Sequence, residues 1–183
     1  GGGGGGGGGG GNDDESDVFG CSCDDTLILS ASDDRTCKLW DMRSRSTTHA
    51  AAVLRHHSHF VNAAQLLSVD LLVTGSRDMS VQIVDLRAPD RALERIVDRH
   101  GGSIYSLAVR SATSFVSGSL DGHARLWTRS GGAWQCEQDM CMSDGVQAIA
   151  LHGDVALLGD KSGRVSAFAL QPGFGMSGGG GGG

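Results

Sequence analysis

The feature of this chain that most limits how it can fold is a segment that recurs four times along the sequence. One column of the repeat holds Trp40, Val84, Trp127 and Phe168, at successive spacings of 44, 43 and 41 residues. A second column keeps the same spacings and holds Asp34, Asp78, Asp121 and Ser162. Helical solenoids and β-propellers both use repeats of about 40–45 residues. The period therefore leaves the fold class open, and the local pattern inside each repeat has to decide it.

Each repeat consists of short apolar runs separated by turn residues. In the second repeat these runs are residues 61–66, 71–76, 81–85 and 93–97, and in the third they are residues 104–109, 114–118, 124–128 and 133–137. Short apolar runs bounded by turn residues are typical of β-strands, and no segment shows the longer periodicity of an amphipathic helix. Four short strands in about 40–45 residues make one propeller blade, so the sequence predicts an all-β fold of about four blades.

The number of strands predicts an incomplete ring. Each repeat supplies three inner strands, but an outer strand follows only the first three repeats, at residues 50–54, 93–97 and 133–137. The sequence after Leu170 contains Pro172 and is a poor strand, because proline cannot donate to a sheet. We therefore predict a partial β-propeller of four-stranded antiparallel sheets, whose open ring exposes strand edges and apolar blade faces. Either the missing blades lie elsewhere in a longer parent protein, which is the interpretation favoured here, or another chain completes the ring.

The predicted propeller segment covers residues 18–170, in units of about 18–54, 55–97, 98–137 and 138–170. It is flanked by residues 1–17, which are glycine-rich and acidic, and by residues 171–183, which are glycine-rich. A glycine tract has no side chain to bury and loses the most backbone entropy on ordering, so both tails are expected to be disordered.

The repeats resemble WD repeats, also called G-beta repeats, over about residues 18–170. The dipeptide Trp40-Asp41 is the one that gives this family its name. His57 and His100 match the histidine of the family's glycine-histidine signature, although the preceding glycine is replaced in both repeats. Each of these histidines lies 21 residues before the aspartate of its own repeat, and this repeated spacing makes a chance match improbable.

The resemblance implies a hydrogen-bonded network inside each blade, formed by the histidine, the turn aspartate, a hydroxyl of the second strand and the tryptophan nitrogen. The residues assigned to it are Asp34, Trp40, His57, Asp78, His100, Asp121 and Trp127. Ser117 or Ser119 would supply the hydroxyl of the third repeat. The arrangement makes chemical sense, because a partly buried carboxylate needs donors and imidazole, hydroxyl and indole N–H groups all donate. Replacing Asp121 with alanine would leave those donors without an acceptor and should lower the free energy of unfolding by about 1–3 kcal/mol.

The same residues do not predict an enzyme. His, Asp and Ser recur repeat by repeat, whereas a catalytic centre is needed once. The cluster His56-His57-x-His59 has no further cysteine or acid at metal-ligand spacing, and His57 already has a place in the repeat. The glycine pairs 101–102 and 131–132 lie between strands and do not open a helix, so they are turns and not phosphate loops. No catalytic residue, cofactor site or metal site is predicted.

Binding is expected on the loops, because a blade carries its structural residues in the sheet. By resemblance, three loop-proximal positions of each repeat line one face of the propeller, here named the top face. The residues selected there are Phe19, Asp33, Phe60, Asn62, Arg77, Tyr105, Leu120, Gln147 and Lys161. Aromatic residues and arginine concentrate binding energy at protein interfaces. The alternative for Phe19 and Phe60 is simple packing between blades.

A pair of Asp-x-Arg doublets occurs at the end of the third strand in two repeats. They are Asp41 with Arg43 and Asp85 with Arg87. Such doublets look like those of propellers that dock on adaptors of cullin-type ubiquitin ligases, where an arginine fork suits a carboxylate or backbone carbonyls. The alternative is that each arginine pairs with an acid of its own or the next blade.

Composition narrows the class of partner. The net charge of −6, the absence of a basic stripe and an aromatic content of 5% argue against nucleic-acid binding. Five cysteines without a secretion signal predict reduced thiols and a cytoplasmic or nuclear location. No apolar stretch reaches the roughly 20 residues of a membrane span.

We predict a WD-repeat scaffold that binds other proteins or peptides, with a substrate receptor or adaptor of a ubiquitin ligase as one specialised form. The alternative is a nucleic-acid-associated propeller subunit in an RNA-processing complex.

Overall fold

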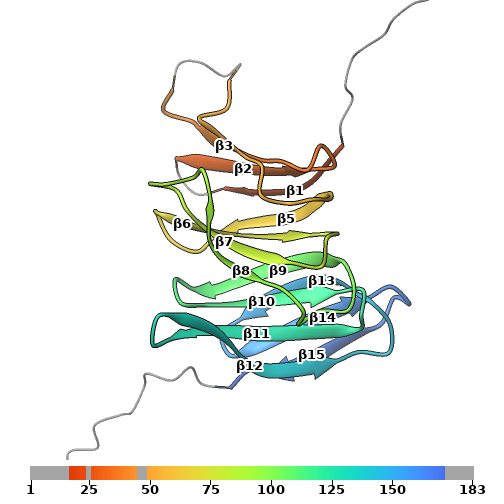
Figure 1. Ribbon diagram of the computed structural model, residues 1–183. Coiled ribbons are helices and arrows are strands. Elements are labelled where there is room, and N and C mark those ends of the chain that lie inside the picture. Colours follow the sequence, from red (N-terminus) through yellow and green to blue (C-terminus); the bar gives the residue numbers. More distant parts are fainter. Residues whose placement is uncertain (1–16, 24–25, 45–48, 172–183) are drawn as a thin grey trace, which may run out of the picture.

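The structure is a computed structural model that describes residues 17–23, 26–44 and 49–171. Within these ranges it consists of fifteen β-strands and contains no helix, as the repeat pattern predicted. The strands form four separate antiparallel sheets, and Figure 1 shows the sheets stacked one after another in chain order. Residues 1–16 and 172–183 of the two predicted tails lie outside the described residues.

Each sheet is one blade, and its strands neighbour one another in sequence order. Blade 1 contains β1 (Val18–Cys23), β2 (Leu27–Ser32), β3 (Cys37–Asp41) and β4 (Ala52–Leu54). Blade 2 contains β5 (Val61–Leu66), β6 (Leu71–Ser76), β7 (Val81–Asp85) and β8 (Ala92–Ile96). Blade 3 contains β9 (Ile104–Ser111), β10 (Ser114–Ser119), β11 (His123–Ser130) and β12 (Ala133–Cys141). Blade 4 contains β13 (Val146–His152), β14 (Val155–Asp160) and β15 (Val165–Ala169), so its described part lacks an outer strand.

The core lies between the blades, because alternate side chains of each strand point to opposite faces of the sheet. In β10, Phe115 packs toward blade 2 and Val116 packs toward blade 4, and both are fully buried. Three hydrophobic clusters result, one for each junction between consecutive blades. Among the described residues, no such cluster joins blade 4 to blade 1. The four blades therefore form an open arc, which confirms the predicted partial propeller.

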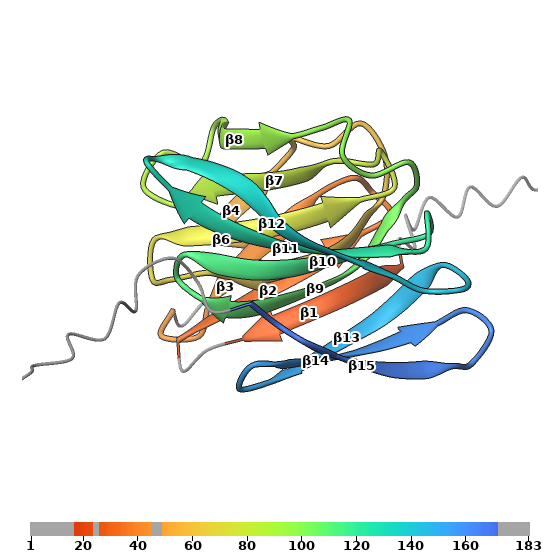
Figure 2. The ribbon, with the colours of Figure 1, turned by 90° about the horizontal axis from the view of Figure 1, so that it is seen from below.

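The arc has a defined inner side, because the first strand of each blade contacts the first strand of the next, β1 with β5, β5 with β9 and β9 with β13. In Figure 2, β1 and β9 lie near the middle of the molecule, between the outer strand β8 at the top and the strands of blade 4 at the bottom. The loops that enter these inner strands are consequently brought together around the inner edge of the arc.

The turn between the second and third strands requires a left-handed residue in every blade. Arg35 and Met79 occupy this place in blades 1 and 2, with φ of 68° and 66°, and Gly122 and Gly163 occupy it in blades 3 and 4, both with φ of 84°. Glycine adopts this conformation without steric cost, whereas arginine and methionine adopt it only in a tightly specified turn. The residue before it is the turn position of the repeat, which the sequence placed at Asp34, Asp78, Asp121 and Ser162.

No helix among the described residues is long and apolar enough to cross a bilayer.

Candidate functional site

The polar network of blade 3 is complete and buried. His100 Nδ1 lies 3.1 Å from Asp121 Oδ2, and His100 Nε2 lies 2.8 Å from Ser117 Oγ. The indole nitrogen of Trp127 donates to the same Ser117 oxygen at 2.8 Å. A neutral His100 that donates from Nδ1 and accepts at Nε2 satisfies all of these contacts. Of the two serines that the sequence left open, Ser117 joins the network and Ser119 accepts from the backbone N–H of Asp121.

Blade 2 builds the same network without a tryptophan. His57 Nδ1 lies 3.0 Å from Asp78 Oδ2, and His57 Nε2 lies 2.8 Å from the hydroxyl of Thr74. Ser80 donates a further hydrogen bond to Asp78 at 2.6 Å. Val84 takes the place of the tryptophan and is fully buried, so this blade exchanges an indole donor for apolar packing.

Blades 1 and 4 have no histidine in the repeat position and use their carboxylates differently. In blade 1, Asp34 accepts hydrogen bonds from Thr36 and Lys38, while Trp40 donates to Ser30 at 3.1 Å. In blade 4 the acid stands two residues before the expected turn position. Asp160 accepts from the backbone and side chain of Ser162, and Ser143 Oγ also donates to it.

Sequence reasoning missed Asp160 because the alignment fixed the turn column at Ser162. The signal that could have found it was an acid immediately before a Lys-Ser-Gly turn that lacks one at the usual position.

The pKa of His100 and that of Asp121 are both lowered by the structure, for different reasons. Burial lowers the pKa of His100 to about 4, and the negative charge of Asp121 opposes this shift only in part. For Asp121, burial by itself would raise the pKa. Hydrogen bonds from the backbone of Gly101 and His123, together with the side chains of His100 and Arg125, outweigh it and hold the pKa well below its usual range. At neutral pH the network therefore contains a carboxylate and an uncharged imidazole.

Stability is expected to fall as the pH drops from about 6.5 to about 4, because of His100. Its pKa is about 4 when folded and 6.5 in the ordinary state, so in this window the unfolded chain binds the extra proton. The stability lost over the window is at most about 3 kcal/mol. Urea unfolding measured across this range should show a shallower slope for His100→Gln than for the wild type. A slope for His100→Gln equal to that of the wild type would contradict the prediction.

The loop positions predicted for the top face are joined in the same way in all four blades. In each blade, the backbone N–H of the residue before the turn position donates to the carbonyl of the residue before the first strand or at its entrance. These hydrogen bonds run from Asp33 to Asp17, Arg77 to Phe60, Leu120 to Ser103 and Lys161 to Gly145, at 2.8–3.2 Å. The same backbone bond therefore fixes the top-face loops at equivalent places around the arc.

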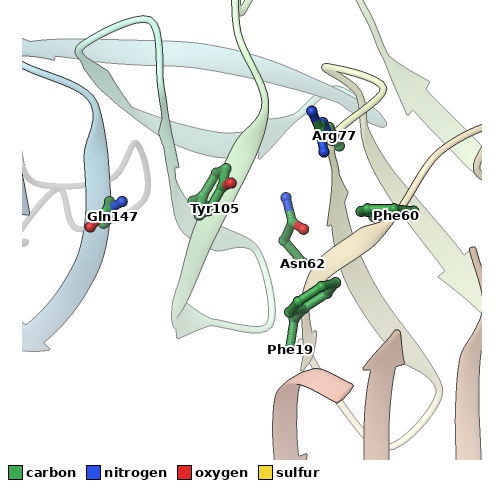
Figure 3. A pocket seen from close by; sticks show the side chains of 6 residues that line it. All are labelled: Phe19, Phe60, Asn62, Arg77, Tyr105 and Gln147. Carbon is green, nitrogen blue, oxygen red and sulfur yellow. The ribbon is translucent and has the colours of Figure 1, made fainter. Parts of the chain in front are cut away.

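Six of the nine predicted top-face residues line one pocket of about 420 Å³. They are Phe19, Phe60, Asn62, Arg77, Tyr105 and Gln147, and Figure 3 shows them arranged around it from all four blades. The other three, Asp33, Leu120 and Lys161, do not line this pocket.

The pocket combines one cation with aromatic rings and amides. The guanidinium of Arg77 lies over the ring of Phe60, 5.5 Å from its centroid, and Phe19 tilts against Phe60 at 6.0 Å. Asn62 Nδ2 donates to the backbone carbonyl of Ile104 at 2.7 Å, which holds its amide in one orientation. Phe19 and Phe60 thus contact each other across two blades, yet Phe19 remains 49% exposed. These two rings therefore both pack between the blades and line the pocket.

The two Asp-x-Arg doublets have the same geometry at the opposite ends of the strands. Arg43 Nε and Nη2 each lie 2.9 Å from the carboxylate of Asp41, and Arg87 makes the same two contacts with Asp85 at 2.9 and 2.6 Å. Each arginine is therefore paired with the acid of its own doublet, which is the arrangement named as the alternative to docking. Both arginine side chains remain 70% exposed.

The comparisons with known proteins agree with the repeats and the fold. The family WD domain, G-beta repeat, matches residues 11–41 and 92–128. The chain is 32% identical to WD repeat-containing protein 1 of Xenopus tropicalis, over 58% of this chain and 18% of that protein. It is 27% identical to the ribosome biogenesis protein ytm1 of Aspergillus fumigatus, over 69% of this chain and 26% of that protein. The chain thus spans less than a third of the length of these relatives.

Solved structures show the same fold at low sequence identity. The WD40 β-propeller domain of Doa1 superposes with a TM-score of 0.66 at 22% identity, over 84% of this chain and 53% of that chain. The computationally designed Ika4 protein superposes with a TM-score of 0.73 at 23% identity, over 86% of this chain and 93% of that chain. The repeated strands, the blade networks and these matches together show WD-type repeats that fold as blades of a β-propeller.

Proposed function

We propose that this chain is a protein-interaction scaffold whose top-face pocket binds an acidic segment of a partner protein. The observation that carries the proposal is the convergence of Arg77 and two phenylalanine rings on one open pocket. Arginine and aromatic residues are enriched at the centres of protein interfaces, where a few residues supply most of the binding energy. The proposed function is binding without catalysis, at a cytoplasmic or nuclear location.

The chemistry of the pocket favours a carboxylate beside an apolar side chain. Arg77 presents planar donors to an anion, and its stacking on Phe60 fixes the direction of the guanidinium. Phe19 and Tyr105, 49% and 38% exposed, flank it and would cover an apolar neighbour in the ligand. Asn62, already held by Ile104, would offer its amide carbonyl to a peptide N–H. A cationic ligand is disfavoured because the charged residue that lines this pocket is an arginine.

Replacing Arg77 with alanine is expected to weaken peptide binding by about tenfold or more, as is typical of an interfacial arginine anchor. The probe is an array of peptides in which each Asp or Glu is compared with its amide, followed by titration calorimetry on the best peptide. The matched control is Lys161→Ala, which removes a top-face cation outside the pocket. Equal affinity for the acid and amide peptides, or equal losses for the two variants, would contradict the proposal.

A substrate receptor or adaptor of a ubiquitin ligase is a specialised form of this scaffold. The support is the shared geometry of Arg43 and Arg87, two exposed guanidinium groups presented at equivalent strand ends of neighbouring blades. A cullin-type adaptor that recruits this chain should be lost from a pulldown with the double variant R43A/R87A. The top-face variant Arg77→Ala should retain it. Absence of any such adaptor from the wild-type eluate would exclude this form.

A nucleic-acid-associated subunit remains the second candidate function, and the similarity to a ribosome biogenesis protein favours it. The same pulldown, repeated after nuclease treatment, separates the two functions. Partners that bind the top face directly should survive the nuclease, whereas loss of all partners would favour the nucleic-acid-associated function. The net charge of −6 supports the first outcome.

A further inference from the structure

The outward face of blade 4 has the composition of an interior blade face, yet it is exposed. The equivalent position of the second strand holds Leu29, Val73 and Val116 in blades 1 to 3, all fully buried against the next blade, and Leu157 in blade 4, which is 43% exposed. In the third strand, Val165 is 70% exposed, whereas its counterparts Cys37, Val81 and Ala124 are at most 2% exposed. Such exposed apolar faces mark sites of association.

The glycine of this face, Gly159, indicates which kind of residue should pack on it, because its counterparts in blades 2 and 3 each contact the next blade. A Cβ atom added at Gly75 would lie 2.5 Å from Ile104 of blade 3, and one added at Gly118 would lie 2.7 Å from Val146 of blade 4. Each glycine therefore admits a branched residue from the first strand of the next blade. Gly159 continues this column, but the nearest described atom to an added Cβ is Ala148 of its own blade, at 3.6 Å.

Blade 1 carries the matching residue on its opposite, equally open face. Val18 pairs with Ser32 as Val61, Ile104 and Val146 pair with the corresponding second strands of their own blades. Those three residues are at most 1% exposed, whereas Val18 is 61% exposed. Trp40 lies on this face and is only half-buried, although its counterpart Trp127 is buried. The open face of blade 4 and the open face of blade 1 therefore have the residues that would form one complete junction between blades.

We propose that two copies of this chain close a ring, with blade 4 of each copy packed on blade 1 of the other. Val18 of one copy would fill the space beside Gly159 of its partner, and Trp40 would become buried at the same junction. The size of the arc supports two copies, because it superposes on 53% of a solved WD40 propeller chain, which makes it about half a ring. Two identical junctions related by a two-fold axis then leave no blade face open.

Sedimentation equilibrium of the full chain tests the proposal. A closed dimer is expected at about 100 μM protein, where a micromolar dimer is saturated, and its mass should stay at two copies as the concentration rises. Gly159→Gln and Val18→Lys should each raise the dissociation constant by about tenfold or more, the loss expected when a packed apolar contact is disrupted. The control is Val69→Lys, an even more exposed valine, 77%, in the turn between β5 and β6.

Val18 and Val69 are exposed, and a Cβ added at half-buried Gly159 makes only an ordinary contact, so each variant should fold as a monomer with a thermal melt near that of the wild type. Tryptophan fluorescence gives a second readout, since burial of Trp40 on association should shift the emission to shorter wavelength. A wild-type chain that stays monomeric would overturn the proposal. So would assemblies that grow beyond two copies, or a dimer that the Gly159 and Val18 variants weaken no more than the Val69 variant does.

Discussion

Replacing Trp127 with alanine is expected to destabilise the arc by about 3–5 kcal/mol, the usual cost of deleting a buried large aromatic side chain. Trp127 is 2% exposed and packs in the cluster between blades 2 and 3, with its ring centroid 6.2 Å from that of Phe115. Its indole nitrogen donates to Ser117, which also contacts His100. The substitution therefore leaves a cavity and removes a donor from the blade 3 network. Urea unfolding followed by circular dichroism measures the loss.

Trp40→Ala is the matched control for this prediction. Trp40 occupies the same column and donates to Ser30 as Trp127 donates to Ser117. It lies on the open face of blade 1 and is only half-buried, so its removal should cost less than about 2 kcal/mol in the monomer. Equal losses for the two tryptophan variants, measured at a concentration where the chain is monomeric, would show that the open arc is wrong.

Replacing Asp121 with alanine is expected to cost about 3 kcal/mol, the upper end of the range that its position in the repeat implied. The structure adds two reasons for the upper end. Asp121 accepts hydrogen bonds from the backbone N–H groups of Gly101 and His123, and it pairs with Arg125 at 3.1 Å. The side chain of Arg125 is 13% exposed and also pairs with the more exposed Asp139, so losing Asp121 removes one of the two acidic partners of a mostly buried charge. Thermal melts and urea titrations measure the loss.

Asp34→Ala tests the same turn position where the carboxylate is more exposed. Asp34 binds Thr36 and Lys38, and the side chains of Asp34 and Lys38 are 27% and 33% exposed. The expected loss is about 1 kcal/mol, because solvent compensates for an exposed pair. Equal losses of stability for the Asp34 and Asp121 variants would contradict the prediction that the complete network of blade 3 makes Asp121 the more important of the two.

The strand boundaries show how far a repeat pattern can be read without a structure. The inner strands of blade 2 lie where the apolar runs placed them, at Val61–Leu66, Leu71–Ser76 and Val81–Asp85. Other bounds differ: the inner strands β9 and β11 of blade 3 each end two residues later than predicted, and the outer strands shift more, since β8 begins one residue earlier and β12 extends to Cys141. An outer strand packs on one neighbour, so its apolar pattern is weaker and its ends depend on pairing with the third strand.

The candidate site, too, was predicted from the sequence in part and missed in part. The resemblance to WD repeats selected nine top-face residues, and six of them meet in one pocket because the backbone bond between Arg77 and Phe60 has an equivalent in every blade. The alignment failed at Asp160, where the carboxylate moved two residues along the chain and still reaches the turn. The donors of such a turn can bond to a carboxylate at either of these two positions. Sequence position alone therefore does not identify the acceptor residue.

The sequence by itself determined the blades, since the short apolar runs and the turn residues between them are local features of each repeat. Only the tertiary structure decided which aromatic and charged side chains share a pocket, and which blade faces remain uncovered. The physical reason is that these properties belong to junctions between blades. Whether Leu29 or Leu157 is buried depends on the presence of a neighbouring sheet, although both occupy the same place in the repeat.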